Sequence, residues 1–190
     1  MSAFPVVSAL RRATQSAHRA LEEGADLEWR LAEACSRAGT LQAFHRFHDG
    51  VERRAHPVLG RLDAGFDLRS RASDLTKDLT RLGAAPLPRG AANPLATAGE
   101  ALGWVYVAEG SMLGGRIIRR RLTADGVDLR GLDFLDPFGA ATGERWQAFM
   151  RLLEDACAAG AARAADVVQG GIDAFAFAHD TLDRRAEALT

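Results

Sequence analysis

A histidine and a carboxylate lie one helical turn apart near the start of the chain. His18 is followed four residues later by Glu22, within a segment whose apolar residues recur at helical spacing. Residues at this separation share a helix face, so the Glu22 carboxylate, or a water that it holds, can accept from one imidazole nitrogen while the other nitrogen faces a metal. The pair predicts a metal ligand with an orienting neighbour, although a half-buried structural histidine gives the same pattern.

A second feature is a helical segment, Gly99 to Leu122, that is unusually rich in glycine. Each glycine inside a helix costs about 1 kcal/mol relative to alanine, so the segment sacrifices local stability. This predicts a large flat ligand lying against the helix backbone, with Tyr106 and Ser111 beside it. The alternative is close helix packing through small residues. The glycines are Gly99, Gly103, Gly110, Gly114 and Gly115.

Other metal and nucleophile patterns are absent from the sequence. His45 and His48 are three residues apart, but no Glu-x-x-His pair of a di-iron bundle occurs. Zinc-ligand spacings, a Gly-x-Ser-x-Gly elbow and a phosphate-binding glycine loop are also missing. These absences weaken the non-haem iron, hydrolase and nucleotide-binding interpretations.

Taken together, the two segments resemble the haem oxygenase family. The first contains LRRATQSAHRALE (Leu10 to Glu22), which is similar to the family's pattern around the proximal haem ligand. The second contains GWVYVAEGSMLGG (Gly103 to Gly115), which looks like the distal helix of the bacterial members. Further similarity lies in GERWQAFMRLL (Gly143 to Leu153) and AFAFAHDTL near the end, so the resemblance covers nearly the whole chain.

The resemblance implies a role for each matching residue. His18 would ligate the iron with Glu22 as its neighbour, and Gly110, Gly114 and Gly115 would form the distal wall. Ser111 stands where the animal enzymes carry an aspartate. His48 falls where some bacterial relatives place a histidine of the distal water network, although a core histidine fits that position equally well.

Cationic and phenolic groups are expected at the haem carboxylates. Arg11 lies two turns before His18 on nearly the same face and could pair with a propionate. Tyr106 matches a propionate-contacting position, and Arg151 is a third, weaker candidate. A cluster near the end of the glycine-bearing segment is either a docking patch for an acidic electron donor or a plain exposed helix end. It consists of Arg116, Arg119, Arg120 and Arg121.

The implied activity is cleavage of haem b (iron protoporphyrin IX), which is both substrate and cofactor, by O2 and external electrons. The products would be biliverdin, carbon monoxide and iron. A ferredoxin or a flavin reductase would supply the electrons, and the biliverdin could serve a bacteriophytochrome. A haem carrier or sensor on the same fold, and a helical scaffold protein without a ligand, remain as alternatives.

Bulk composition limits the partners and the organisation of the chain. A formal net charge of -1 and a hydrophobic content of 47% give no reason to expect nucleic acid or a membrane surface as partner. No apolar run has the length of a signal or a membrane span, so a cytoplasmic protein is expected. The 190 residues predict one domain, spanning 1–190.

The elements that must position these residues are all helical. Apolar periodicity and cap residues predict an all-α fold with no strand, in which Ser8 and Thr40 begin the first and third helices. A proline-rich loop over Ala84 to Ala96 and an irregular stretch over Gly126 to Gly139 interrupt the pattern. The expected helices are Ser8–Glu23, Asp26–Arg37, one from Thr40, Leu68–Leu82, Gly99–Leu122, Thr142–Ala159 and Ala162–Leu189.

Overall fold

A computed structural model describes residues 4–61 and 66–182, and all the regular structure in these ranges is helical. The sequence prediction of an all-α fold is therefore confirmed. The α-helices are α1 (Pro5–Ala25), α2 (Leu27–Ala32), α3 (Ala34–Leu59), α4 (Arg71–Arg81), α5 (Ala98–Ala124), α6 (Thr142–Ala158) and α7 (Ala164–Leu182). Two short 3-10 helices, η1 (Asp133–Leu135) and η2 (Gly139–Ala141), lie between α5 and α6.

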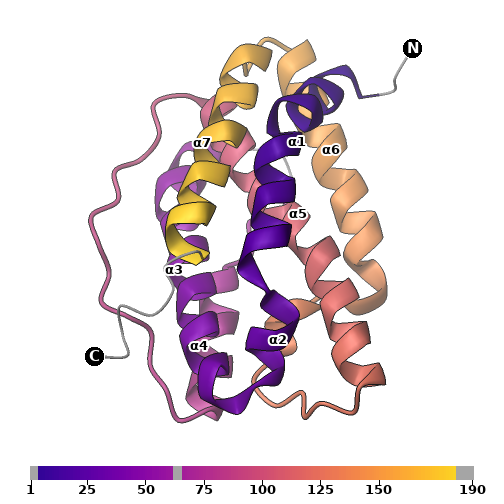
Figure 1. Ribbon diagram of the computed structural model, residues 1–190. Coiled ribbons are helices and arrows are strands. Elements are labelled where there is room, and N and C mark those ends of the chain that lie inside the picture. Colours follow the sequence, from indigo (N-terminus) through magenta and orange to yellow (C-terminus); the bar gives the residue numbers. More distant parts are fainter. Residues whose placement is uncertain (1–3, 62–65, 183–190) are drawn as a thin grey trace.

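The glycine-bearing helix α5 is central and packs most extensively against α7 (Figure 1). A β-carbon on Gly103 would overlap the backbone of Val167 and Gly171 of α7, and one on Gly99 would lie 2.7 Å from the β-carbon of Asp166. Gly170 of α7 meets the α5 backbone in the same way. For this half of α5, the packing interpretation of the glycines is correct.

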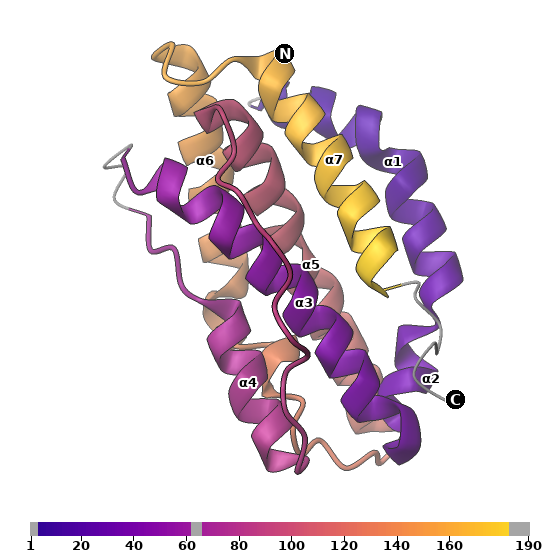
Figure 2. The same cartoon turned by 90° about the vertical axis from the view of Figure 1, so that its left-hand side faces the viewer.

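The remaining helices surround this pair. The first helix, α1, packs against α7 and α6, while α3 packs against α4, α5 and α7 (Figures 1 and 2). The loop after α4 runs along the outer side of α3 (Figure 2). It is tied there because the Arg54 carbonyl accepts from the Leu95 amide at 3.0 Å and Arg53 donates to the Gly90 carbonyl at 2.8 Å. The loop expected over Ala84 to Ala96 is confirmed.

Two expected helix starts are wrong. The first helix begins at Pro5, whose fixed φ suits the first helical position, and the Ser8 hydroxyl donates to the Phe4 carbonyl. Its end also differs, because α1 continues through Gly24 and stops at Asp26, where φ is 40°. Thr40 lies inside α3 and donates to the Ser36 carbonyl rather than capping the helix.

The later elements follow the sequence prediction more closely. A capping box formed by Thr97 and Glu100 begins α5. Thr142 is the first residue of α6, but its hydroxyl donates to Asp136 and caps no backbone amide. The described part of α7 reaches Leu182, so the expected continuation to Leu189 lies outside the described residues.

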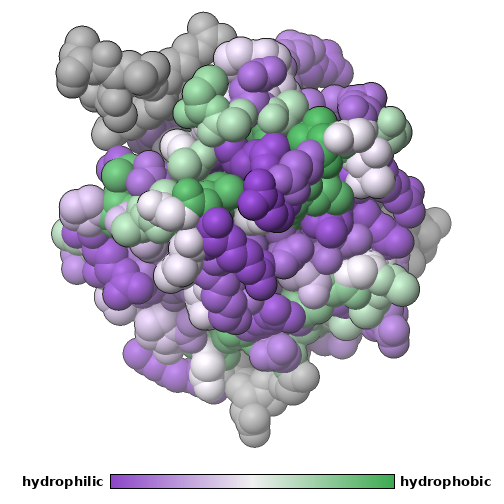
Figure 3. Space-filling model, turned by 90° about the horizontal axis from the view of Figure 1, so that it is seen from below, coloured by the Kyte–Doolittle hydropathy of each residue, from purple (hydrophilic) through white to green (hydrophobic). Residues whose placement is uncertain are grey.

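Over the described ranges, no helix is both long enough and apolar enough to cross a membrane. The face near α2 and the end of α4 is mainly hydrophilic, with small separated hydrophobic areas (Figure 3).

Candidate functional site between α1 and α5

A cavity of about 830 Å³ separates α1 from α5 and is bounded further by α3, α7 and η1. This volume is typical of a site for a small organic ligand or cofactor. Much of its wall is apolar, which favours a ligand with broad hydrophobic faces. Its apolar lining includes Leu21, Phe44, Phe47, Phe134, Trp146 and Phe175.

His18 and Glu22 lie on the α1 wall of this cavity. The imidazole Nδ1 of His18 is 3.3 Å from a Glu22 carboxylate oxygen, and the ring makes a T-shaped contact with Phe175 at 5.8 Å between centroids. Because Glu22 engages Nδ1, Nε2 is the nitrogen left for a ligand. The His18 side chain is 57% exposed, since it borders open cavity space rather than packed core.

The opposite wall is the backbone of α5 at Gly110 and Gly114. A β-carbon on Gly114 would meet nothing within 4 Å, and one on Gly110 would make only ordinary contact with Trp146 at 3.6 Å. Neither glycine is therefore required by packing within the protein. Gly115 also borders the cavity, but a β-carbon there would lie 2.5 Å from the Leu135 carbonyl oxygen, so its small size serves packing against η1.

Ser111 borders the cavity beside these glycines. Its hydroxyl donates to the Ala108 carbonyl at 2.7 Å, so the proton is engaged on α5 and the oxygen lone pairs remain able to accept.

Arg11 and Tyr106 meet at another part of the lining. The Arg11 Nε donates to the Tyr106 hydroxyl at 3.3 Å, and one Nη reaches the Met150 sulfur at 3.6 Å. The structure thus brings this predicted pair together. It does not do so for Arg151, which is exposed on α6 and is not among the residues that border the cavity.

His48 reaches the cavity from α3 and is otherwise buried. Burial lowers its pKa well below the usual value, and the charges of Arg71 and His45 lower it further. The imidazole is therefore neutral at neutral pH and can both donate and accept a hydrogen bond.

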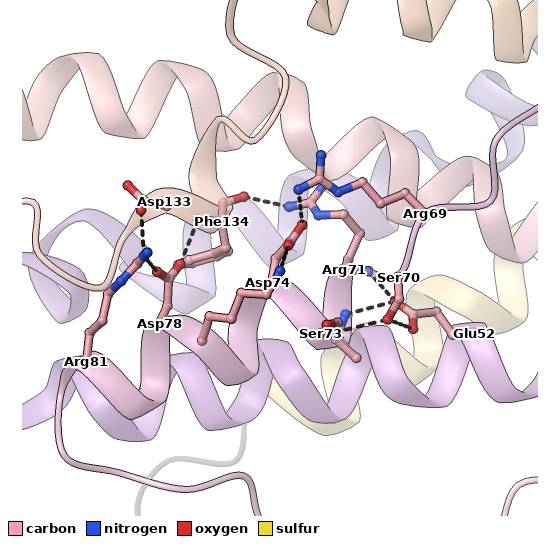
Figure 4. A network of polar contacts seen from close by, with 12 residues as sticks. Glu52, Arg69, Ser70, Arg71, Ser73, Asp74, Asp78, Arg81, Asp133 and Phe134 are labelled. Atoms are coloured by element: carbon pink, nitrogen blue, oxygen red, sulfur yellow. Dashed lines mark hydrogen bonds and ion pairs between the residues drawn. The ribbon is translucent and has the colours of Figure 1, made fainter.

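Arg71, which the sequence analysis did not single out, also borders the cavity. One Nη donates to the Phe134 carbonyl at 2.5 Å (Figure 4). Burial lowers the pKa of its guanidinium to about 10, so it is still a cation at neutral pH. A signal was present in the sequence, since arginine is unfavourable in the first turn of a helix and Arg71 follows the cap residue Ser70 directly.

Most of the arginines near the end of α5 are paired with carboxylates. Arg116 is 3.8 Å from Asp136, Arg119 is 3.8 Å from Asp133, and Arg121 pairs with Glu28 of α2. These pairs reduce the positive potential of the predicted docking patch.

The fold is all-helical over the described residues, and across an apolar cavity it places His18 opposite the backbone of Gly110 and Gly114. This arrangement suits a protein that holds a flat ligand between two helices. The Heme oxygenase family model matches residues 5–184. A heme oxygenase of Xanthomonas campestris pv. campestris (strain 8004) is 34% identical over 163 residues, which are 81% of this chain and 93% of the relative. The chain belongs to the haem oxygenase family.

The fold is shared with a solved structure. The NO- and CO-bound heme oxygenase of Neisseria meningitidis superposes with a TM-score of 0.73 at 23% identity, covering 98% of this chain and 96% of that chain. The resemblance stated from the sequence is confirmed at the level of family and fold.

Proposed function

We propose that this haem oxygenase binds haem b in the cavity between α1 and α5 and cleaves it with O2 and external electrons to biliverdin, carbon monoxide and iron. The observation that carries the proposal is the placement of His18 opposite Gly110 and Gly114, across a cavity of suitable volume. A β-carbon on Gly114 would meet no protein atom, which leaves that part of the helix backbone open to a ligand.

The residues present fit a haem. The Nε2 of His18 would hold the iron, while Glu22 fixes the orientation of the ring through Nδ1. Apolar side chains would cover the macrocycle, and Arg11 with Tyr106 would receive a propionate at the cavity edge. When bound, haem supplies the iron at which O2 is reduced, and its own macrocycle is the group oxidised.

The α5 backbone would control where O2 lies. With no side chain at Gly110 or Gly114, the helix backbone would leave room for O2 beside the haem and would limit the directions in which it can lie. A larger residue at either position would occupy that space.

Protons would reach this space through water held by polar groups of the wall. The neutral imidazole of His48 can hold such a water, and the Ser111 oxygen can accept from one. Gly115 would contribute by letting η1 approach α5 closely, not by contacting the substrate.

The electron donor would be a ferredoxin or a flavin reductase. Because Arg116, Arg119 and Arg121 are paired with carboxylates, exposed Arg120 is the member of the cluster best placed to meet an acidic donor. We place this activity in the cytoplasm, where its biliverdin could supply a bacteriophytochrome.

A haem titration followed by turnover tests the proposal. Purified protein is titrated with hemin, and reductant is then added in air while the visible spectrum is recorded. We expect a one-to-one Soret complex that decays to a bilin band, and loss of both in His18→Ala. His56→Ala is the matched control, since His56 lies near the end of α3 and does not border the cavity.

The outcomes separate the alternatives. A saturable complex that never yields bilin with any competent donor would favour a carrier or sensor. An absence of saturable haem binding would contradict the oxygenase and the carrier alike.

A further inference from the structure

Arg71 is a buried cation whose hydrogen-bonding capacity is largely unused. The residue is only 5% exposed, yet Nε and one Nη have no hydrogen-bond partner among the described residues. A buried donor without a partner is costly, and a buried charge more so. Since Arg71 borders the cavity, a ligand or water there is the remaining source of compensation.

The nearby carboxylates are engaged elsewhere. Glu109 binds Arg145 through both oxygens, at 2.9 and 2.8 Å. Asp74 pairs with Arg69 at 2.8 Å (Figure 4). It also pairs with Lys77 at 3.2 Å.

The third neighbouring carboxylate, Glu52, accepts from the Ser70 hydroxyl at 2.7 Å and from the backbone amides of Arg71 and Ala72. The negative charges of these three carboxylates raise the pKa of Arg71 from a distance. Among the described residues, none of the three lies within ion-pair distance of its guanidinium.

Helix electrostatics also oppose a cation at this position. Arg71 is the first residue of α4, where the helix dipole favours negative charge. An arginine that is both buried and placed at the positive end of a helix is expected only where an anion or a strong acceptor meets it.

The guanidinium of Arg71 is held on the α5 side of the cavity. One Nη donates to the Phe134 carbonyl, and the Phe134 amide donates to Asp78 at 2.8 Å, so both backbone groups of Phe134 are fixed by α4 (Figure 4). The same short helix, η1, packs closely on α5 at Gly115. Arg71 therefore belongs to the wall opposite His18, where its positive charge lowers the pKa of His48.

We propose that Arg71 is the anion-binding group of this cavity and that its free Nε and Nη donors hold a small inorganic anion on the α5 side of the bound haem. The inference rests on the proposed function, because haem is what brings an anion to this position. It assigns Arg71 the task of stabilising negative charge that forms between the macrocycle and α5.

Anion affinity of the ferric haem complex provides the test. Azide and fluoride are titrated into the complex, with imidazole as a neutral iron ligand. We expect Arg71→Met and Arg71→Gln to weaken azide and fluoride binding by about tenfold or more, because each removes a close positive charge. Imidazole affinity should change by less than about threefold. Arg71→Lys keeps the positive charge but not the planar pair of donors, so it should retain part of the azide affinity that Arg71→Met loses.

The matched control is Arg69→Gln. Arg69 is a neighbouring arginine that pairs with Asp74 and does not border the cavity, so azide affinity should change by less than about twofold. Equal azide affinity in wild type and Arg71→Met, or an equal loss of azide and imidazole affinity, would overturn the proposal.

A second comparison tests the proposal if Arg71→Met and Arg71→Gln do not fold. Asp74→Asn leaves Arg71 in place and removes one of the negative charges that act on it, so azide affinity should rise by about twofold. An unchanged or lower affinity would count against the proposal. Haem titration of wild type keeps the two hypotheses apart, because loss of haem binding there contradicts the proposed function, whereas unaltered azide affinity in a haem-binding Arg71 variant contradicts only this inference.

Discussion

At the scale of single residues, the glycines of α5 differ in what surrounds them. Gly114 faces open cavity, so Gly114→Ala should stabilise the haem-free protein by about 1 kcal/mol through helix propensity. The same methyl group enters the space that we propose for haem and O2, so the rate of bilin formation should fall severalfold. Urea unfolding of the haem-free protein and a turnover assay measure the two effects.

Gly103→Ala is the matched comparison. Its β-carbon would overlap the α7 backbone at Val167 and Gly171, where no flexible side chain can move aside. We expect a loss of about 1–3 kcal/mol in the free energy of unfolding. Stability equal to wild type would show that α5 and α7 pack less closely than the contacts of Gly103 indicate.

His48 makes stability depend on pH. Its pKa in the folded protein is well below the ordinary 6.5, because burial disfavours the charged imidazole. Below about pH 6.5 the unfolded chain therefore binds a proton that the folded protein does not, and stability falls as pH falls. His48→Gln should lose less free energy of unfolding between about pH 7 and about pH 5 than wild type does. Parallel pH profiles for the two proteins would contradict a neutral buried His48.

At this scale, the grouping of candidate site residues could be predicted from sequence where the signal was local. His18 with Glu22, and Gly110 with Gly114, each lie on one helix face, so spacing alone groups them. Arg71 was missed because its environment depends on Phe134, which is distant in sequence and meets it only after folding. The packing role of Gly115 depends on the equally distant backbone of Leu135.

At the scale of elements, α4 fixes the position of η1. The buried carboxylate of Asp78 accepts from the Phe134 amide, and Arg81 bridges Asp78 to Asp133 at 2.8 and 2.6 Å (Figure 4). Asp78→Ala leaves the buried Phe134 amide without an acceptor and should cost about 1–3 kcal/mol.

Asp133→Ala is the control for this element. It removes the ion pairs of exposed Asp133 with Arg81 and Arg119 and should cost less than about 1 kcal/mol. Denaturant unfolding distinguishes the two variants, and equal losses would show that η1 is not held by the buried hydrogen bond.

Helix existence could be predicted from sequence more reliably than helix ends. Apolar periodicity extends over a whole helix, whereas an end depends on one or two residues. Ser8 and Thr40 have the side chains of N-caps, but each hydroxyl also bonds the carbonyl four residues earlier, which is compatible with a helix interior. Local residue type therefore did not decide between the two positions.

At the scale of the whole molecule, the cavity separates a well-packed part of the protein from a part that the proposed ligand would complete. On one side, α3, α5 and α7 pack against one another, and α4 packs against α3 and η1. On the other side, the second half of α1 borders the cavity, and its attachment relies on α6 and α7. Haem bound to His18 would add a contact between α1 and α5 to the hydrogen bond that Arg11 donates to Tyr106.

Ligand binding should therefore stabilise the molecule unevenly. At free haem about a hundredfold above its Kd, the free energy of unfolding should rise by about 2.7 kcal/mol. Hydrogen exchange should slow most in the part of α1 around His18 and Glu22, and least in α4, because α4 meets the cavity mainly through Arg71. In His18→Ala both effects should be largely lost. Equal protection of α1 and α4 on haem addition would place the ligand elsewhere, since a ligand held from His18 would join this part of α1 to α5 across the cavity.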